Sequence, residues 1–490
     1  MSGLPKGWVE ATLEDLCEFN PKHDPETDRA TTVSFIPMPA VDDETGAIVD
    51  SSAIRPLSEV WKGYTHFADA DVIFAKITPC MENGKIAVAR DLENGMACGS
   101  TEFHVLRSKG AVKPDFVWRF LRQRSYRQMA ERSMTGAVGQ RRVPKPFLEG
   151  TTLPLPPLAE QKRIVAKLDA LNAKSARART ELARIETLVS RYKQAVLRSA
   201  FLGAMTSAWR TKRADLQTAF DLIDRTPTPP QPKGGREATD RVIQGKAALA
   251  INAPARGAPP KWRWVPLSRI ARQETGHTPS RSHPEWWDGE IPWIGIKDAG
   301  ANHGRVIEET IQTTNEEGLA NSAARLLPAG TVCLSRTASV GYVTIMGKPM
   351  ATSQDFVTWT CTEALVPKFL MYALMAEGDD IREFGKGTTH TTIYFPEVRA
   401  MQICLAPLEE QHEIVRRIET AFAKIDRLAR EAKRALELLG RLDEAILAKA
   451  FRGELVPQDE NDESAEHVLA RIRAERQAAP KGKSGRGARG

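Results

Sequence analysis

The chain has 490 residues; 27% are charged, 41% are hydrophobic, and 69 basic against 62 acidic residues give a net charge of +7. That length is too great for one hydrophobic core and predicts two to four domains. No apolar run approaches the ~20 residues of a membrane helix and the N-terminus shows no secretion signal, so we expect a cytoplasmic protein whose weak positive charge permits nucleic-acid binding without requiring it.

The first predicted unit of structure is a globular block over residues 1–155. Short apolar stretches such as "DADVIFAKI" (69–77) lie between turns, and "PDFVWRFLRQ" (114–123) has a helical pattern. Strands mixed with short helices predict an α+β fold. A polar loop rich in glycine, "TGAVGQRRVP" (135–144), follows near the end of the block.

A long helix is predicted next, over residues 156–206. It opens with "PPLAEQKRIVAKLDAL" (156–171), in which Pro157 occupies the first turn, where a helix tolerates proline, and Glu160 favours the N-terminal dipole. Apolar residues follow at 4-3-4-3 spacing, a coiled-coil pattern that only Ser175 interrupts. The predicted seam contains Ile164, Leu168, Leu171, Leu182, Ile185 and Val189.

The density of proline and glycine in "TPTPPQPKGG" (226–235) predicts an exposed linker over residues 207–258. A second α+β block is predicted over residues 259–404, and it repeats landmarks of the first. "PAGTVCLSRT" (328–337) echoes the stretch at 69–77, and "KGTTHTTIYFP" (386–396) echoes the loop at 135–144.

A second long helix is predicted over residues 405–456, and it repeats the first at a constant offset of 250 residues. "APLEEQHEIVRRIETA" (406–421) matches the opening of the first helix, and the match continues without a gap to residue 455. The seam continues through Ile414, Ile418, Ile425, Leu428, Leu439 and Leu442. We expect the two helices to form an antiparallel coiled coil with a pseudo-twofold axis; the alternative is that each packs on its own block.

A charged tail, 457–490, follows, with a short amphipathic helix near 464–476.

Two divergent blocks, each followed by a nearly identical helix that opens with P-L-x-E-Q-x-x-I-V, resemble the specificity subunit of type I restriction–modification enzymes. Stretches that add to the resemblance are "ETGHTPSRSHPEWWDGEIPWIGIKDAG" (274–300), "KITPCMENGKIA" (76–87), "GSTEFHVLR" (99–107) and "TSQDF" (352–356). The likeness runs from Trp8 to about Arg476.

The resemblance implies a non-catalytic subunit that gives DNA specificity to a type I restriction–modification complex. Each block would be a target-recognition domain that reads one half of a bipartite double-stranded DNA site, and the paired helices would set the spacer. Two methyltransferase subunits would bind S-adenosylmethionine and methylate adenine, and restriction subunits would use ATP and Mg²⁺. The apolar residues Val165, Leu188, Val415 and Leu438 either receive helices of the methyltransferase subunits or pack locally.

The sequence itself contains no catalytic motif that we could identify. It has no GxxxxGK[ST] phosphate loop, no N-P-P-[YF] motif of adenine methyltransferases, and neither the CxxC nor the paired-histidine spacing of zinc sites. We therefore expect no catalytic residue, no metal site and no cofactor in this chain. Alternatives are an enzyme with a diverged catalytic block, a coiled-coil scaffold that binds proteins, and an orphan DNA-binding protein.

Residue type and matched position suggest the DNA contacts, because Lys and Arg suit phosphates and guanine whereas Asn and Gln suit adenine. In the first block the candidates are Lys76, Asn83, Lys85, Gln140, Arg141, Arg142 and Lys145. In the second block they are Arg281, Lys297, Arg336, Ser339, Lys386, Thr388, Thr389, His390 and Thr391. Ordinary surface charge is the competing interpretation for each of them.

Overall fold

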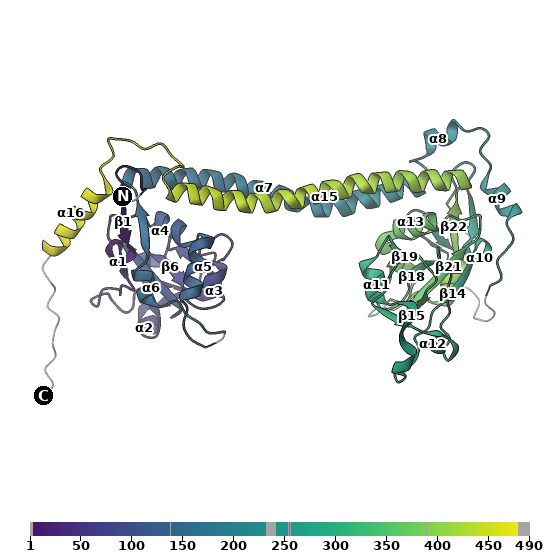
Figure 1. Ribbon diagram of the computed structural model, residues 1–490, viewed down its shortest axis with the longest axis horizontal. Helices are drawn as coiled ribbons and strands as arrows, with labels where there is room; N and C mark the ends of the chain where they lie inside the picture. The colour runs from purple at the N-terminus through teal and green to yellow at the C-terminus, as the bar shows by residue number, and fades with distance from the viewer. Residues whose placement is uncertain are drawn as a thin grey trace. The chain divides into compact units, whose positions relative to one another are not determined.

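The computed structural model describes residues 3–137, 139–231, 242–252, 254, 256–387 and 391–478. Its contacts divide the chain into unit 1, Met1–Leu182 with Lys433–Gly490, and unit 2, Ala183–Ala432 (Figure 1). Each unit combines helices with sheets, as the predicted α+β class requires. No helix among these described residues is both long and apolar enough to cross a membrane.

Unit 1 contains two four-stranded sheets and a short ribbon. The ribbon pairs β1 (Val9–Thr12) antiparallel with β10 (Thr152–Leu155). One sheet has the order β2 (Cys17–Phe19), β9 (Phe103–Ser108), β6 (Val72–Ala75), β7 (Ile86–Val88), and the other β4 (Ile54–Pro56), β3 (Thr32–Ile36), β8 (Met96–Gly99), β5 (Thr65–Ala68). The short helices are α1 (Leu13–Leu16), α2 (Leu57–Val60), α3 (Cys80–Asn83), α4 (Pro114–Leu121), α5 (Arg124–Ser133) and α6 (Lys145–Glu149).

The described residues of unit 2 form three sheets. The first has the strand order β11 (Ile243–Gln244), β12 (Leu249–Ile251), β22 (Met401–Leu405), β13 (Arg263–Pro266). The second has the order β14 (Ala271–Thr275), β21 (Phe356–Cys361), β18 (Val332–Ser335), β19 (Val343–Met346), β16 (Val306–Ile307). The third has the order β17 (Gln312–Thr314), β15 (Trp287–Ile294), β20 (Ala351–Thr352). Its short helices are α8 (Ser207–Thr211), α9 (Ala219–Arg225), α10 (Leu267–Ile270), α11 (Ile296–Ala301), α12 (Glu316–Ala320), α13 (Pro367–Glu377) and α14 (Phe395–Ala400). The segment expected to be a linker thus contributes α8, α9, β11 and β12.

The two long helices are α7 (Leu158–Phe201) and α15 (Leu408–Phe451), each of 44 residues. In unit 1 the Ser175 hydroxyl of α7 donates a hydrogen bond to Asp443 of α15 at 2.7 Å. In unit 2 Lys193 of α7 pairs with Asp426 of α15 at 2.6 Å. The early part of α7 therefore lies beside the late part of α15 in unit 1, and the reverse holds in unit 2.

The buried face of these helices departs from a strict heptad repeat. Ten of the twelve predicted seam residues are buried or half-buried, but Leu428 and Leu442 are 60% and 50% exposed. Their successors Ala429 and Asp443 are half-buried instead. Between these two positions Ala432 is buried and Ala435 and Leu439 are half-buried, so the departure from the heptad repeat is local.

A buried glutamate joins each long helix to a tryptophan at the start of a block. In unit 1 the indole Nε1 of Trp8 donates to Glu160 at 3.0 Å. In unit 2 the indole of Trp262 donates to Glu410 at 2.9 Å. Both carboxylates are 1% exposed or less, so the glutamate of the repeated motif does more than favour the helix dipole.

The glutamine that follows each glutamate closes the same junction. Gln161 accepts a hydrogen bond from the backbone N–H of Lys113 at 2.8 Å, and Gln411 accepts one from Val366 at 2.9 Å. Each glutamine also donates to two buried backbone carbonyls. Lys113 and Val366 are the N-cap residues of α4 and α13, so each glutamine supplies an acceptor at a helix end that would otherwise lack one.

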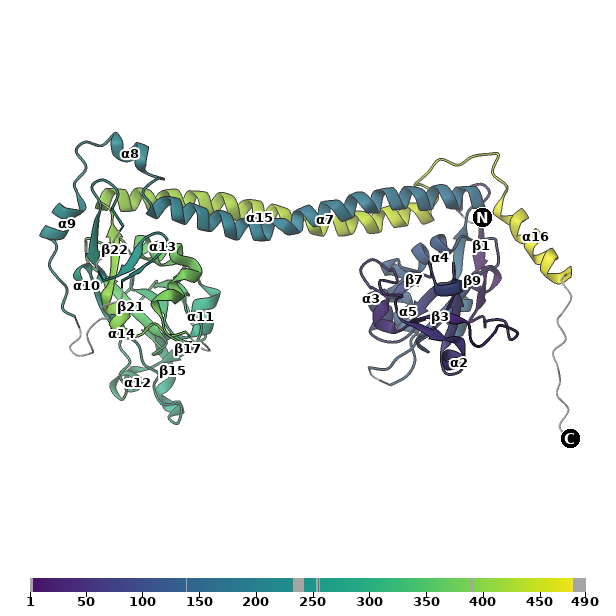
Figure 2. The ribbon, with the colours of Figure 1, turned by 180° about the vertical axis from the view of Figure 1, so that it is seen from behind.

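The segments after the long helices also make matching contacts. Ala219, the first residue of α9, donates its N–H to the carbonyl of Lys261 at 2.9 Å, and Ala465, the first residue of α16 (Ala465–Ala478), donates to Gly7 at 3.0 Å. Figure 2 shows α16 after the end of α15 and close to the N-terminus of the chain. The predicted helix of the tail is thus present, and it packs on the core of unit 1.

Candidate nucleic-acid interface

In unit 1 backbone pairing brings the end of β6 to the loop at 135–142. Bridges link Arg142 to Ile77 and to Thr135. The N–H of Val143 donates to the carbonyl of Lys76 at 2.8 Å. Lys76 therefore lies next to the segment that contains Gln140, Arg141 and Arg142, although more than sixty residues of sequence separate it from that segment.

Unit 2 repeats this arrangement at the end of β18. The N–H of Ile393 donates to the carbonyl of Arg336 at 2.9 Å, and Lys386 pairs with Thr392 across the loop. Arg336 thus occupies the place of Lys76. Of the remaining loop candidates, Thr391 is half-buried, whereas Thr388, Thr389 and His390 lie outside the described residues.

The two matched cations hold the same kind of partner. Lys76 Nζ donates to the carbonyl of Thr101 at 2.8 Å, and Arg336 Nη2 donates to the carbonyl of Gln354 at 3.1 Å. Arg336 also lies over the ring of Phe395, 4.5 Å from its centroid, and its burial lowers the pKa of the guanidinium. Both cations are therefore fixed in direction before any ligand arrives.

Several other candidate cations are engaged within their own block. Arg142 makes two hydrogen bonds of 2.9 Å with Glu102, which lower the pKa of that carboxyl. Lys145 pairs with Glu149 at 2.7 Å, and Lys386 of unit 2 pairs with Glu397 at 2.9 Å. Lys85 donates to the carbonyls of Val41 and Met38. These cations would have to exchange or share a partner to bind phosphate.

Other candidates project from the surface. Asn83 and Gln140 are exposed, and Lys297 is exposed on α11. Within the described part of the chain these three side chains make no hydrogen bond or ion pair. Arg141 lies 3.9 Å from Glu131, a loose ion pair at the protein surface. Asn and Gln can bind the adenine edge through two hydrogen bonds, so Asn83 and Gln140 are the candidates best placed to read bases.

Arg281 and Ser339 complete the candidate set in unit 2. Arg281 lies over the ring of Trp287, 3.8 Å from its centroid, and donates to Gln312 at 2.8 Å. Three residues earlier, the Thr278 hydroxyl donates a hydrogen bond to the side-chain oxygen of Gln354. The backbone carbonyl of Gln354 is the acceptor for Arg336. The carbonyl of Ser339 accepts a hydrogen bond from the Ser335 hydroxyl. Ser339 therefore lies in the segment that turns back toward the end of β18.

A family model described as the type I restriction modification DNA specificity domain matches residues 5–187 and again residues 259–438. The chain belongs to this family. The two matches cover both blocks and most of both long helices, so the internal repeat corresponds to two specificity domains. The resemblance predicted from the sequence is confirmed.

Curated relatives carry the same description. The EcoEI specificity subunit of Escherichia coli is 40% identical over 169 residues, which are 34% of this chain and 28% of that relative; the EcoAI subunit of Escherichia coli has the same coverage. The EcoBI specificity subunit of Escherichia coli is 27% identical over 362 residues, 70% of this chain and 69% of the relative. The chain thus spans less than a third of the first two relatives.

Solved structures show the same fold. The HsdS subunit from Thermoanaerobacter tengcongensis is 22% identical, with a TM-score of 0.61 over 92% of this chain and 98% of that chain. A chain from a structure of complex assembly in the type I R-M system is 23% identical, with a TM-score of 0.66 over 92% of this chain and 99% of that chain.

Sequence reasoning missed an acidic residue at each of the two surfaces of this specificity-domain protein. The Glu102 carboxylate accepts from Arg142, and its backbone carbonyl accepts the N–H of Lys76 at 2.9 Å. The backbone carbonyl of Asp355 accepts the N–H of Arg336 at 2.8 Å, and its carboxylate accepts from the Thr337 hydroxyl. Both acids lie in stretches that carried the family resemblance, "GSTEFHVLR" and "TSQDF". Their matched position before a phenylalanine was the available signal.

Proposed function

We propose that this chain is the DNA-reading subunit of a type I restriction–modification complex, in which each block reads one half of a bipartite site. The observation that carries the proposal is the matched pair of surfaces. Lys76 and Arg336 make matching backbone contacts, and each side chain donates to a backbone carbonyl, yet the sequences of the loops beside them differ. A common frame with different exposed side chains suits two readers of different base sequences.

The catalytic work in this proposal belongs to other subunits in the cytoplasm. Two methyltransferase subunits would bring S-adenosylmethionine for adenine methylation, and restriction subunits would bring ATP and Mg²⁺. This chain would supply no catalytic residue and no cofactor for those reactions. Its part is to bind double-stranded DNA and to hold the partner subunits at the chosen site.

The long helices have two roles in the proposal. As an antiparallel coiled coil they would relate the two readers by a pseudo-twofold axis and set the spacer of the bipartite site. Their exposed leucines would dock the methyltransferase subunits: Leu188 and Leu428 of unit 2 are 42% and 60% exposed, and Leu438 and Leu442 of unit 1 are 52% and 50% exposed. Val415 is only 7% exposed, so local packing accounts for it.

The test is to map adenine methylation by long-read sequencing in cells with and without this chain. Loss of one bipartite motif on removal of the chain is the expected result. An unchanged methylation pattern, together with the absence of salt-dependent DNA binding by the purified complex, would favour the scaffold alternative, because phosphate contacts release counterions and make affinity depend on salt.

The spacer role has its own test. Deleting seven residues from both α7 and α15 removes ~10 Å of helix at 1.5 Å per residue, which corresponds to about three base pairs at 3.4 Å per step. We expect the methylated motif to keep both halves and lose about three base pairs of spacer. A spacer of unchanged length would contradict the proposal that the helices measure it.

A further inference from the structure

Two histidines and a cysteine meet inside unit 1, on the sheet of β3, β4, β5 and β8. His66 of β5 and Cys98 of β8 are directly opposite each other in the antiparallel register. His23 comes from the loop after β2, and its ring centroid lies 4.8 Å from that of His66. The Nδ1 or Nε2 atoms and the Sγ atom lie within 4.8 Å of one another, and the three residues are 5% exposed or less.

The hydrogen bonds of the two rings assign their tautomers. His23 Nε2 faces the carbonyl of Ala97 at 2.9 Å, and His66 Nε2 faces the carbonyl of Trp61 at 2.9 Å. A carbonyl oxygen only accepts, so both Nε2 atoms carry a proton. His66 Nδ1 accepts the backbone N–H of His23 at 3.3 Å, so this nitrogen carries a lone pair and no proton.

The hydrogen bonds also show how the rings are held. Each Nε2–H is anchored to a backbone carbonyl, and the Nδ1 atom of His66 accepts an N–H, so that ring is neutral with its lone pair on Nδ1. Metal-ligating histidines are oriented by this kind of second hydrogen bond, which fixes the tautomer and the direction of the ring.

The ligand atoms select the kind of cation. Mg²⁺ and Ca²⁺ prefer oxygen ligands. Two imidazoles and a thiolate instead suit Zn²⁺ or Cu⁺, which bind nitrogen and sulfur strongly.

We propose that His23, His66 and Cys98 bind a thiophilic d¹⁰ cation, Zn²⁺ or Cu⁺, through the two Nδ1 atoms and Sγ. Binding forms two metal–nitrogen bonds and one metal–sulfur bond, and the Cys98 thiol releases its proton to solvent. Ligand atoms around zinc lie roughly 3.5 Å apart, so the three side chains would close in by about 1 Å and the contact from the His23 N–H to His66 would be given up.

A cation at this place would fasten the loop after β2 to the sheet that contains β5 and β8. His23 is on the loop, whereas His66 and Cys98 are on neighbouring strands. The His23 ring already contacts the carbonyl of Ala97 on β8, and its backbone N–H donates to His66 on β5. The inferred site is therefore structural, and none of its three residues is a candidate for DNA binding.

The experiment uses the full chain purified under reducing conditions and dialysed against metal-free buffer with a chelator. Zn²⁺, Cu⁺ and the spectroscopic probe Co²⁺ are then titrated separately, and bound metal is counted by elemental mass spectrometry. We expect one equivalent of Zn²⁺ or Cu⁺ per chain, and for Co²⁺ a thiolate charge-transfer band with the d–d bands of a distorted tetrahedral site.

Matched variants decide whether the signal comes from this cluster. C98S and H66N should lose the bound equivalent and the cobalt–thiolate band. C333S is the control, because Cys333 is equally buried on β18 of unit 2, and it should keep both. The wild-type melting temperature should rise with the metal, and that of C98S should not.

Two results would overturn the inference. One is a folded wild-type chain that takes up none of the three cations. The other is C98S binding as much metal as the wild type, which would place the binding elsewhere. Should C98S fail to fold, the wild-type cobalt spectrum still decides, because a spectrum without the thiolate band rejects Cys98 as a ligand.

Discussion

The two junctions between block and long helix share their geometry but differ in charge. In unit 1 the carboxylate of Glu160 accepts from the Trp8 indole, and its Oε1 atom has no hydrogen-bond partner in the structure. In unit 2 the carboxylate of Glu410 accepts from Trp262, from the Thr206 hydroxyl at 2.6 Å and from Arg210 at 2.9 Å. Among the described residues the buried acid of unit 1 makes no ion pair, whereas that of unit 2 pairs with Arg210.

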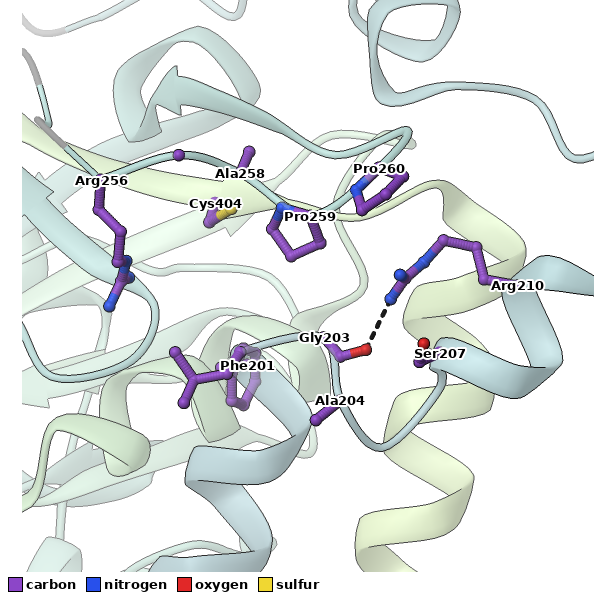
Figure 3. Close-up of a pocket in the computed structure, with 12 residues that line it drawn as sticks. Phe201, Gly203, Ala204, Ser207, Arg210, Arg256, Ala258, Pro259, Pro260 and Cys404 are labelled. Carbon is purple, nitrogen blue, oxygen red and sulfur yellow. Dashed lines mark hydrogen bonds between the residues drawn. The ribbon is translucent and has the colours of Figure 1, made fainter.

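Arg210 reaches Glu410 because the chain turns sharply after α7. Gly203 ends that helix with a φ of +74°, and its carbonyl accepts from Arg210 Nη2 at 2.8 Å (Figure 3). A Cβ at Gly203 would lie 2.7 Å from Pro259. These residues border a cavity of 390 Å³. The repeated motif therefore preserves the hydrogen bond from tryptophan to the buried glutamate in both units. The segment after the long helix supplies a counter-charge for that glutamate in unit 2.

The largest expected effect tests that difference directly. E410Q should destabilise unit 2 by about 3–5 kcal/mol, because it leaves the buried guanidinium of Arg210 without a counter-charge. E160Q should change the free energy of unfolding by about 1 kcal/mol or less, because the amide oxygen still accepts from Trp8. Urea unfolding with hydrogen exchange resolved by peptide would assign each loss to its unit. Equal losses would contradict a difference in charge balance.

A variant at the surface of unit 1 tests whether the two readers act separately. Q140A should cost about 1–3 kcal/mol of discrimination at one base pair of one half-site, because a bidentate contact to adenine would be lost. The other half-site should be unaffected. Methylation kinetics on substituted duplexes measure the effect, and Q128A, on an exposed position of α5, is the matched control. Relaxed specificity in both halves would refute separate readers.

The polar contact within the seam should have a smaller effect. Ser175 is 5% exposed and donates to Asp443, which also pairs with Arg179 at 2.6 Å. S175A should cost about 1 kcal/mol, because Asp443 keeps its arginine. S190A, at an exposed position of the same helix, should lie within about 0.5 kcal/mol of the wild type. The free energy of unfolding in urea compares the two.

The smallest expected effect is a dependence on pH that differs between the units. Burial raises the pKa of Glu160, so the folded state holds its proton more tightly and the stability of unit 1 falls as pH rises from 4.5 through the folded pKa. Hydrogen bonds from Arg416 and Arg417 lower the pKa of Glu413 in unit 2 to about 2, so its contribution is lost as pH falls toward that value. The free energy of unfolding of the wild type, E160Q and E413Q is to be measured between about pH 3 and pH 7. The difference between wild type and E160Q should fall as pH rises, whereas the difference between wild type and E413Q should rise.

Much of the architecture follows from the sequence because local signals specify it. The constant offset of 250 residues, the proline-led openings and the apolar spacing predicted two long helices, and the matched landmarks placed Lys76 and Arg336 at equivalent strand ends. The junction could not be predicted, because Trp8 and Glu160 are 152 residues apart and only the fold brings them together. For the same reason the sequence did not reveal that Glu102 engages Arg142, or that His23 meets Cys98.

The docking of α16 on unit 1 has a consequence for the order of biosynthesis. Unit 2 is one continuous stretch, Ala183–Ala432, whereas unit 1 needs both Met1–Leu182 and Lys433–Gly490. On the ribosome the first block emerges before unit 2, but Val468 and Leu469 complete its apolar core only after all of unit 2 has been made. A premature stop codon between the end of α15 and Val468 would therefore damage a block that is made before unit 2.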